Sequence, residues 1–319
     1  MSSPGKTMIL GSVGGTPLVP LTRVVPEGCA RVFVKVEGQN PTGSMKDRMA
    51  LSVIERAAAT GRLKPGGRVV EYTGGSTGTS LAFVCAARGY AITVVTSDAF
   101  SLEKRDHMRA LGAVVIEIES EDGRTTKELI QRMMARAAEL SSPADAFYAD
   151  QFNNPDAATG YSPLATELLS QVGDEIDVFV QSVGTAQCIV GVARVLRERS
   201  PSTRIIAVEP AESAVLSGGQ AGSHKIEGVG PGFVPPMWDQ SLIDGVERVS
   251  TSEAMAMSRR LAREEALFAG TSSGANVVAA LREAQRLGPS GVVVTVLCDS
   301  GLKYLSTHLY GRAFGREMV

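Results

Sequence analysis

A regular alternation of short β-rich runs with helical patterns is the feature that most limits the fold of this chain. From residue 67 the order is strand, helix, strand, helix, strand, helix: GRVVEYT, TSLAFVCAARGY, AITVVTS, LEKRDHMRALG, AVVIEIE and a helical pattern over 125–140. β-Rich runs joined by helices are typical of parallel strands with crossover connections. The first half of the chain therefore predicts a parallel sheet covered by helices.

The same alternation restarts in the second half. It comprises the strand IDVFVQS, a helix over 188–199, the strand RIIAVEP, helices near 253–265 and 273–287, and the strand GVVVTVLC. Two doubly wound α/β units are expected. The glycine- and proline-rich stretch over 217–236 is too long for a simple turn and predicts a loop that lines a site. Ligands of parallel sheets bind at the carboxyl ends of strands, so functional residues are expected after EYT, VQS and VLC.

Charge and composition favour a small-molecule function. The 319 residues are 44% hydrophobic and 21% charged, and 32 basic against 34 acidic residues give a formal net charge of -2. Because neither sign dominates, neither a nucleic acid nor a membrane surface is an expected partner. The four cysteines lie far apart without a Cys-x-x-Cys pair, which indicates reduced thiols in the cytoplasm and no metal site. No export signal and no membrane span are expected, since the N-terminus lacks a cationic segment followed by an apolar run.

Lys46 is notable for its position. It follows a strand and the turn Asn40-Pro41-Thr42-Gly43, and it opens a predicted helix that runs through Leu51 and Ile54. The dipole of a helix favours anions at the N-terminus, so a lysine gains nothing from it there. On position alone, a solvated surface lysine is the commoner interpretation.

The segment around Lys46, NPTGSMKDR, resembles the cofactor-lysine motif of the fold-type II pyridoxal 5′-phosphate (PLP) enzymes. The resemblance is to the cysteine synthase (O-acetylserine sulfhydrylase) / cystathionine β-synthase family in particular. EYTGGSTG resembles the substrate-carboxylate loop of that family, and GGTPLVPL its N-terminal segment. VEPAESAVLSGG and HKIEGVGPGFVPP resemble its large-domain signatures, and FAGTSSGA and CDSGLKYLS its C-terminal cofactor contacts. The segments occur in the family's order from about Leu10 to Leu305.

This resemblance implies a tryptophan-synthase-β-like α/β fold with two doubly wound domains and PLP in the cleft between them. It implies a large PLP-binding domain over 1–44 and 152–319, and a smaller mobile domain over 45–151 that carries the carboxylate loop. Lys46 would hold PLP as a Schiff base and act as the catalytic base. The other implied cofactor-binding residues are Ser76, Gly184, Thr185, Ala186, Gln187, Cys188, Ser272 and Ser300. The implied substrate-binding residues are Thr73, Gly74, Gly75, Ser76, Thr77, Gln151 and Gly228.

The local sequence supports a binding role at three of these places independently of the resemblance. The loop 73–77 precedes a helix expected near Gly78, where amides and hydroxyls can converge on a carboxylate. A plain turn with one N-cap hydroxyl does not explain three hydroxyl residues and two glycines. The segment 184–188 opens a helix and by position is a phosphate-binding cup, although such junctions are common in α/β proteins. Ser300 follows the last strand, where it either faces the pyridine nitrogen or caps a helix KYLSTHLY.

The chain departs from the family's usual pattern at three places. The carboxylate loop usually reads Thr-Ser-Gly-Asn-Thr-Gly, and here the Ser is Gly74 and the cofactor-contacting Asn is Ser76. The phosphate cup usually reads Gly-Thr-Gly-Gly-Thr, and here it ends in Ala186-Gln187-Cys188. If the backbone needs a positive φ at a lost glycine, the cup must differ in shape. Leu164-Ala165-Thr166 replace the usual Thr-Gly-Pro before Glu167, so a divergent subgroup is expected.

The implied activity is that of a PLP-dependent transferase or lyase of amino-acid biosynthesis. It is β-replacement on an O-activated L-serine, in which sulfide or another nucleophile gives cysteine or a β-substituted alanine. Ala211 and Glu212 stand where an arginine would suit phosphoserine, which favours O-acetylserine. Two alternatives stay open: β-elimination, as in a serine/threonine dehydratase or cysteine desulfhydrase, and a catalytically weak paralogue that binds partners or senses metabolites. A cytoplasmic homodimer is expected.

Overall fold

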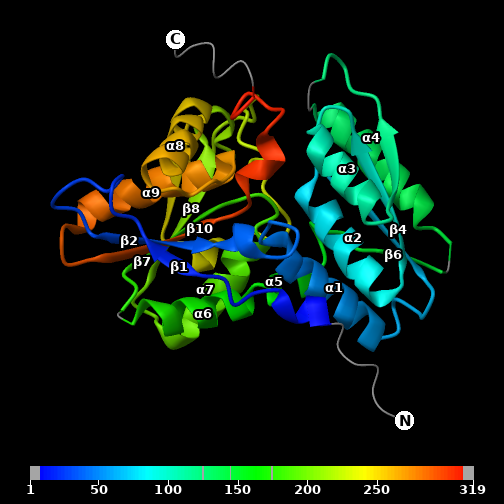
Figure 1. Cartoon of the computed structure of the whole chain (residues 1–319), viewed down its shortest axis with the longest axis horizontal. Coiled ribbons are helices and arrows are strands. Elements are labelled where there is room, and N and C mark those ends of the chain that lie inside the picture. Colours follow the sequence, from blue (N-terminus) through cyan, green and yellow to red (C-terminus); the bar gives the residue numbers. More distant parts are fainter. Residues whose placement is uncertain (1–7, 124–125, 144, 174, 312–319) are drawn as a thin grey trace. The chain divides into compact units, whose positions relative to one another are not determined.

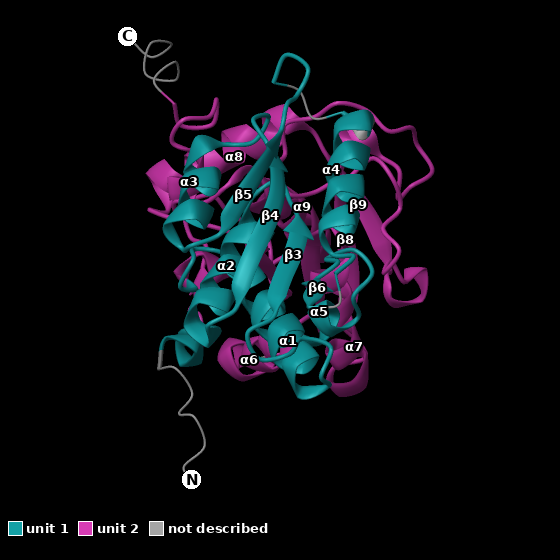
Figure 2. Cartoon of the chain, turned by 90° about the vertical axis from the view of Figure 1, so that its right-hand side faces the viewer, with its two compact units in different colours: residues 1–14, 40–160 teal, residues 15–39, 161–319 magenta. Residues whose placement is uncertain are grey.

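The computed structural model describes residues 8–123, 126–143, 145–173 and 175–311, and the chain divides into two compact units. Unit 1 is Met1–Gly14 and Asn40–Gly160, and unit 2 is Gly15–Gln39 and Tyr161–Val319 (Figure 2). The mixed α/β class with parallel sheets is confirmed. The predicted roles of the two domains, cofactor binding and mobility, stay predictions.

Unit 1 is built on a parallel sheet whose strand order is β5-β4-β3-β6. The strands are β3 (Arg68–Tyr72), β4 (Ala91–Ser97), β5 (Val114–Ile118) and β6 (Ala146–Tyr148). The helices are η1 (Met8–Ser12), α1 (Lys46–Ala59), α2 (Ser76–Arg88), α3 (Leu102–Ala110), α4 (Lys127–Leu140) and α5 (Asp156–Thr159). α2 and α4 cover opposite faces of the sheet (Figure 2). The strands β3 and β4 are almost entirely buried, as is typical of parallel strands that are covered on both faces.

Unit 2 is built on a larger sheet in the order β1-β2-β10-β7-β8-β9, in which β1 alone among the described strands runs antiparallel to its neighbour. The strands are β1 (Leu18–Pro20), β2 (Arg31–Val36), β7 (Val178–Ser182), β8 (Arg204–Pro210), β9 (Gly245–Val249) and β10 (Val292–Leu297). The helices are α6 (Ser162–Val172), α7 (Gln187–Arg199), α8 (Thr251–Glu264) and α9 (Thr271–Leu287). Four short 3₁₀ segments are η2 (Glu37–Gln39), η3 (Ala211–Ser213), η4 (Gln240–Leu242) and η5 (Gly301–Tyr304). α8 and α9 lie on one face of this sheet, and α6 and α7 on the other (Figure 1).

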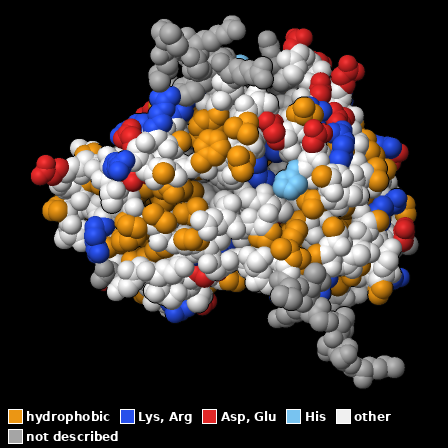
Figure 3. Space-filling view, viewed as in Figure 1, with side chains coloured by type: hydrophobic (Ala, Val, Ile, Leu, Met, Phe, Trp, Pro, Cys, Tyr) orange, Lys and Arg blue, Asp and Glu red, His pale blue; other side chains and the backbone are white. Residues whose placement is uncertain are grey.

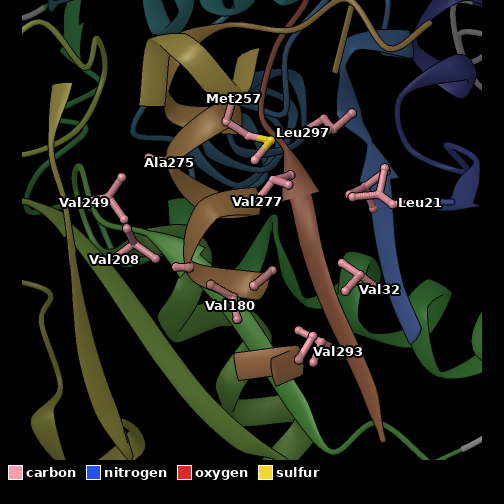
Figure 4. Close-up of a cluster of buried hydrophobic side chains, with 14 of the residues drawn as sticks. Leu21, Val32, Val180, Val208, Val249, Met257, Ala275, Val277, Val293 and Leu297 are labelled. Atoms are coloured by element: carbon pink, nitrogen blue, oxygen red, sulfur yellow. The ribbon is translucent and has the colours of Figure 1, made fainter. Parts of the chain in front are cut away.

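The main core of unit 2 lies where α8 and α9 pack on the sheet. Val180, Val208 and Val293 project from neighbouring strands toward Met257 and Val277 of these helices (Figure 4). Every residue of β7 and β10 is buried. Burial of an aliphatic side chain stabilises the fold by about 1.5–3 kcal/mol, so this cluster fixes the strand ends that carry the candidate site.

The predicted elements are confirmed with differences at their ends. The helix expected near Gly78 begins at Ser76, and the predicted helix KYLSTHLY is only the short η5. Thr125, where a predicted helix started, lies outside the described residues. The strands β6 and β9 and the helices α5 and α6 were not predicted. No helix in the described ranges is long and apolar enough to cross a membrane.

Candidate functional site

Lys46 is the first residue of α1, as its position after a turn predicted. Its N–H donates to Ser44 Oγ at 3.2 Å, and its side chain is half-buried. The turn before it is fixed by Asp47, a fully buried carboxylate that accepts from Thr42 N (2.8 Å) and Thr42 Oγ1 (2.6 Å). A carboxylate in the first helical turn also interacts favourably with the helix dipole. Asp47 therefore anchors the turn that presents Lys46, a role that sequence reasoning missed.

The loop 73–77 connects β3 to α2, where the sequence placed it. Thr73 N donates to Val95 O at 2.9 Å, and Thr73 Oγ1 accepts from Gly75 N at 3.0 Å. Gly75 has φ +152° and ψ −87°, a conformation that side chains disfavour, and α2 begins immediately after it. The first amides of a helix lack intrahelical acceptors, so this loop presents donors at the start of α2.

Gln151 is held against this loop by three hydrogen bonds. Its Oε1 accepts from Thr77 Oγ1 at 2.8 Å, its Nε2 donates to Tyr72 O at 2.8 Å, and its N–H donates to Glu71 Oε2 at 3.0 Å. The residue before it, Asp150, has a positive φ of +48°, which turns the chain at the end of β6. Three predicted substrate-binding residues, Thr73, Thr77 and Gln151, thus lie together in unit 1.

Glu71 supports this arrangement and was also missed. Its Oε1 accepts from Tyr72 N at 2.9 Å while Oε2 accepts from Gln151 N, and the side chain is fully buried. Burial raises the pKa of Glu71 well above its usual range, and the nearby Asp150 raises it further, although the two backbone hydrogen bonds act in the opposite direction. The available signal was an acidic residue inside the otherwise apolar strand RVVEY.

The predicted phosphate cup lies at the start of α7 in unit 2. Ala186 precedes the helix with a left-handed φ of +64°, and its carbonyl accepts from Val190 N at 3.0 Å. A Cβ on Gly184 would lie 2.2 Å from Gly228 O, so Gly184 allows a close backbone approach that no other residue permits. Ala186 stands at one of the two positions where the family usually has glycine, and it adopts a positive φ itself, at a cost of about 1–2 kcal/mol. A difference in the shape of the cup from the family stays a prediction.

The remaining predicted residues of unit 2 lie near the carboxyl ends of β7 and β10. Glu227 N donates to Thr271 Oγ1 at 3.0 Å, which holds the segment containing Gly228 at the start of α9. Ser272 is buried in the first turn of α9. Ser300 Oγ accepts from Leu302 N at 3.3 Å, so Ser300 caps the short η5 instead of a long helix. Its role toward a pyridine nitrogen stays a prediction.

Asn276 of α9 joins the ends of these two strands. Its Oδ1 accepts from Ser182 N at 2.6 Å, and its Nδ2 donates to Val296 O at 2.7 Å. Asn276 is fully buried. Satisfied buried amides of this kind rigidify their surroundings, so Asn276 is a supporting residue that sequence reasoning missed.

The third departure lies in helix α6. Leu164 and Ala165 are fully buried there, so they are packing residues. Glu167 pairs with Lys35 Nζ at 2.6 Å, and the same Nζ donates to Gln171 Oε1 at 2.8 Å. The departure at Leu164-Ala165-Thr166 thus lies in a packed helix, next to a glutamate that pairs with the buried Lys35.

Comparison with known proteins identifies the family of the chain. Residues 9–299 match the family described as pyridoxal-phosphate dependent enzyme. A cysteine synthase from Staphylococcus aureus is 44% identical over 301 residues, which cover 93% of this chain and 95% of that protein. An O-ureido-L-serine synthase from Streptomyces lavendulae is 41% identical over 304 residues, which cover 95% and 92%. A crystal structure of O-ureido-L-serine synthase superposes with a TM-score of 0.88 at 39% identity and covers 98% of both chains. The chain therefore belongs to the family of pyridoxal-phosphate-dependent enzymes and has the fold of its fold-type II members.

Proposed function

We propose that this chain catalyses β-replacement on an O-activated L-serine in the manner of a cysteine synthase, with Lys46 as the residue that holds PLP. The observation that carries the proposal is the loop 73–77, held by the bond from Gly75 N to Thr73 Oγ1 and by the bond from Thr77 Oγ1 to Gln151, in the same unit as a lysine that opens a helix. The names of both relatives, cysteine synthase and O-ureido-L-serine synthase, describe enzymes that make alanines substituted at the β-carbon.

The donor set of unit 2 fits the phosphate of PLP. The helix α7 (13 residues) offers its first amides, Thr185 adds a hydroxyl, and Gly184 has no side chain to cover its backbone. Gln187 and Cys188 follow at the first turn, and Ser272 and Ser300 supply further hydroxyls at neighbouring strand ends. PLP, when bound, withdraws electrons from the α-carbon of the amino acid and so makes its proton removable.

Residues of the chain remove the α-proton and bind the substrate carboxylate. Lys46 takes the α-proton through its Nζ once that amine is uncharged. The amides of 73–77 bind the substrate carboxylate, and Thr73 and Gln151 fix the loop that carries them. Because Thr77 Oγ1 already donates its proton to Gln151 Oε1, the amides are the primary donors and the hydroxyl must rotate to contribute.

We propose O-acetylserine as the activated serine and sulfide as the first nucleophile to test. The choice of O-acetylserine rests on Glu212, whose Oε1 accepts from Thr251 N at 2.8 Å in the place where an arginine would suit a phosphate. Ser76 is shorter than the family's asparagine, so nucleophiles other than sulfide are tested beside it. A nucleophile panel analysed by mass spectrometry makes this comparison directly.

The test of Lys46 is chemical labelling. The purified protein should be yellow, and borohydride reduction followed by peptide mapping should label Lys46. Lys46→Ala should lose turnover by several orders of magnitude, whereas Lys64→Ala, at an exposed lysine of the same unit, should not. A label on another lysine would show that Lys46 does not carry the cofactor.

The test of the reaction type is product analysis with and without sulfide. Cysteine or another β-substituted alanine is expected from O-acetylserine. Pyruvate in place of such a product, even with sulfide present, would overturn replacement in favour of elimination. A yellow protein that consumes no activated serine would indicate a paralogue that binds but does not turn over.

We also propose that the protein is a cytoplasmic homodimer without a nucleic-acid or membrane partner. The charge supports the absence of a nucleic-acid or membrane partner, because basic and acidic side chains are interspersed on the face shown in Figure 3 and the net charge is -2. Sedimentation analysis of the purified protein tests the dimer, and a mass of one chain would refute it.

A further inference from the structure

Two side chains cover the glycines of the carboxylate loop. A Cβ on Gly74 would lie 2.6 Å from Phe100 Cε1 and 3.0 Å from Phe100 Cδ1 and Cζ. A Cβ on Gly75 would lie 2.2 Å from Lys104 Cδ. Heavy atoms in contact approach to about 3.5–4.0 Å, so neither position has room for a side chain while Phe100 and Lys104 stay in place. The family's serine at position 74 cannot be accommodated beside Phe100.

Phe100 is held from both its backbone and its ring. Its N–H donates to Ser97 O at 3.2 Å, in a turn where Ser97 Oγ also accepts from Ala99 N at 3.2 Å. The half-buried ring packs against the core cluster of unit 1. The buried members of that cluster are Val70, Tyr72, Val95, Leu129, Met133 and Ala137. Displacement of the ring from Gly74 therefore costs contacts in the core.

Lys104 makes the second contact with the loop. It lies in the first turns of α3 and is only 4% exposed, so its aliphatic stem crosses Gly75 at close range. Gly75 has a backbone conformation that glycine alone adopts readily, and α2 starts at the next residue. The segment from Phe100 to Lys104 thus packs against Gly74 and Gly75, the two residues that set the direction of the first amides of α2.

We propose that Phe100 is a positioning residue for the carboxylate loop: its ring occupies the volume of a side chain at position 74 and fixes the amides of 73–77. The inference rests on the proposed function, in which those amides bind the carboxylate of an L-amino acid. Positioning of this kind matters because a misplacement of about 1 Å can cost on the order of 10²-fold in rate. Gly74 and Phe100 form a complementary pair, so a change at one position should be compensated at the other.

The experiment is a double-mutant cycle on the holoenzyme. Wild type, Gly74→Ser, Phe100→Ala and the double variant are titrated with L-serine, and its Kd is read from the visible absorbance of the bound cofactor. Each single variant should weaken binding by roughly 10-fold or more, and the double variant should return to within about 3-fold of wild type. KM for O-acetylserine should follow Kd, with a smaller change in kcat.

A second pair of variants separates positioning from general packing. Phe100→Leu should weaken L-serine binding, whereas Phe147→Leu, which shortens a buried ring in β6 of the same unit, should lower the melting temperature and leave Kd unchanged. Additive effects in the cycle, or an unchanged Kd in Phe100→Leu, would overturn the inference. A wild type without cofactor absorbance would overturn the proposed function as well, so the two failures are distinguishable.

Discussion

The replacement of Glu71 by Gln tests how the buried carboxyl supports the carboxylate loop. Glu71 accepts two backbone N–H groups, one on each oxygen: Tyr72 N at 2.9 Å and Gln151 N at 3.0 Å. In Glu71→Gln, one acceptor becomes an NH₂ group that faces a backbone donor. A buried N–H without an acceptor costs about 1–3 kcal/mol, so the variant should be less stable than wild type by about that amount when Glu71 is neutral.

The effect of pH on this difference follows from the raised pKa of Glu71. The unfolded chain ionises near the usual value of 4.5, whereas the folded protein ionises well above it. The stability that Glu71 contributes is therefore fully present below 4.5 and is lost as pH rises through the folded pKa. The slope for one proton is at most about 1.4 kcal/mol per pH unit. Because glutamine does not titrate, the disadvantage of Glu71→Gln should shrink over this window.

Urea unfolding, followed by circular dichroism from just below pH 4.5 to neutral pH, measures this difference. Glu119→Gln is the matched control, since it makes the same substitution at an exposed glutamate of the same unit. Parallel profiles for wild type and Glu71→Gln would refute the reasoning. In the holoenzyme, the same variant should raise KM for the amino acid, because the backbone of either Tyr72 or Gln151, both next to the loop, loses its acceptor.

Two further predictions concern single residues of the site. Ala186→Gly should raise the free energy of unfolding by about 0.5–1 kcal/mol, because glycine adopts the positive φ without strain; a lower melting temperature in a thermal scan would contradict this. Thr77→Val should raise KM for O-acetylserine by roughly 5-fold with little change in kcat, because Gln151 Oε1 loses its donor. Thr77→Ser keeps the hydroxyl and serves as the control in steady-state assays, where equal KM values for both variants would be evidence against the hydrogen bond.

The long elements of the fold could be predicted because their patterns are long or strongly apolar. The runs AITVVTS and GVVVTVLC correspond to β4 and β10, and the pattern over 273–287 lies within α9. β6 has three residues and α5 four, too short to show a period. The predicted helix KYLSTHLY is replaced by the short η5, which ends at Tyr304, and Tyr304 Oη donates to Asp299 Oδ2 at 2.8 Å.

The parts of the candidate site that could be predicted are those whose functional residues lie within one sequence motif. The motif around Lys46 and the loop 73–77 are each a single short segment of the sequence. The structure places both at the predicted ends of elements. Glu71, Phe100 and Asn276 were missed because each acts on a partner that is distant in sequence or is reached through backbone atoms. Only the folded chain brings such partners together, so no local pattern identifies them.

The arrangement of strands in unit 2 has a consequence for synthesis of the chain on the ribosome. β2 is made well before its parallel partner β10, with which it forms pairs such as Val32 with Val293. At ~5–20 residues per second, roughly 250 intervening residues take on the order of tens of seconds. Over that interval, the edge of β2 that pairs with β10 has no partner strand. The sheet of unit 1, in contrast, is complete once Tyr148 has emerged. Nascent chains that stop before β10 should therefore bind chaperones through β2, and release should require β10.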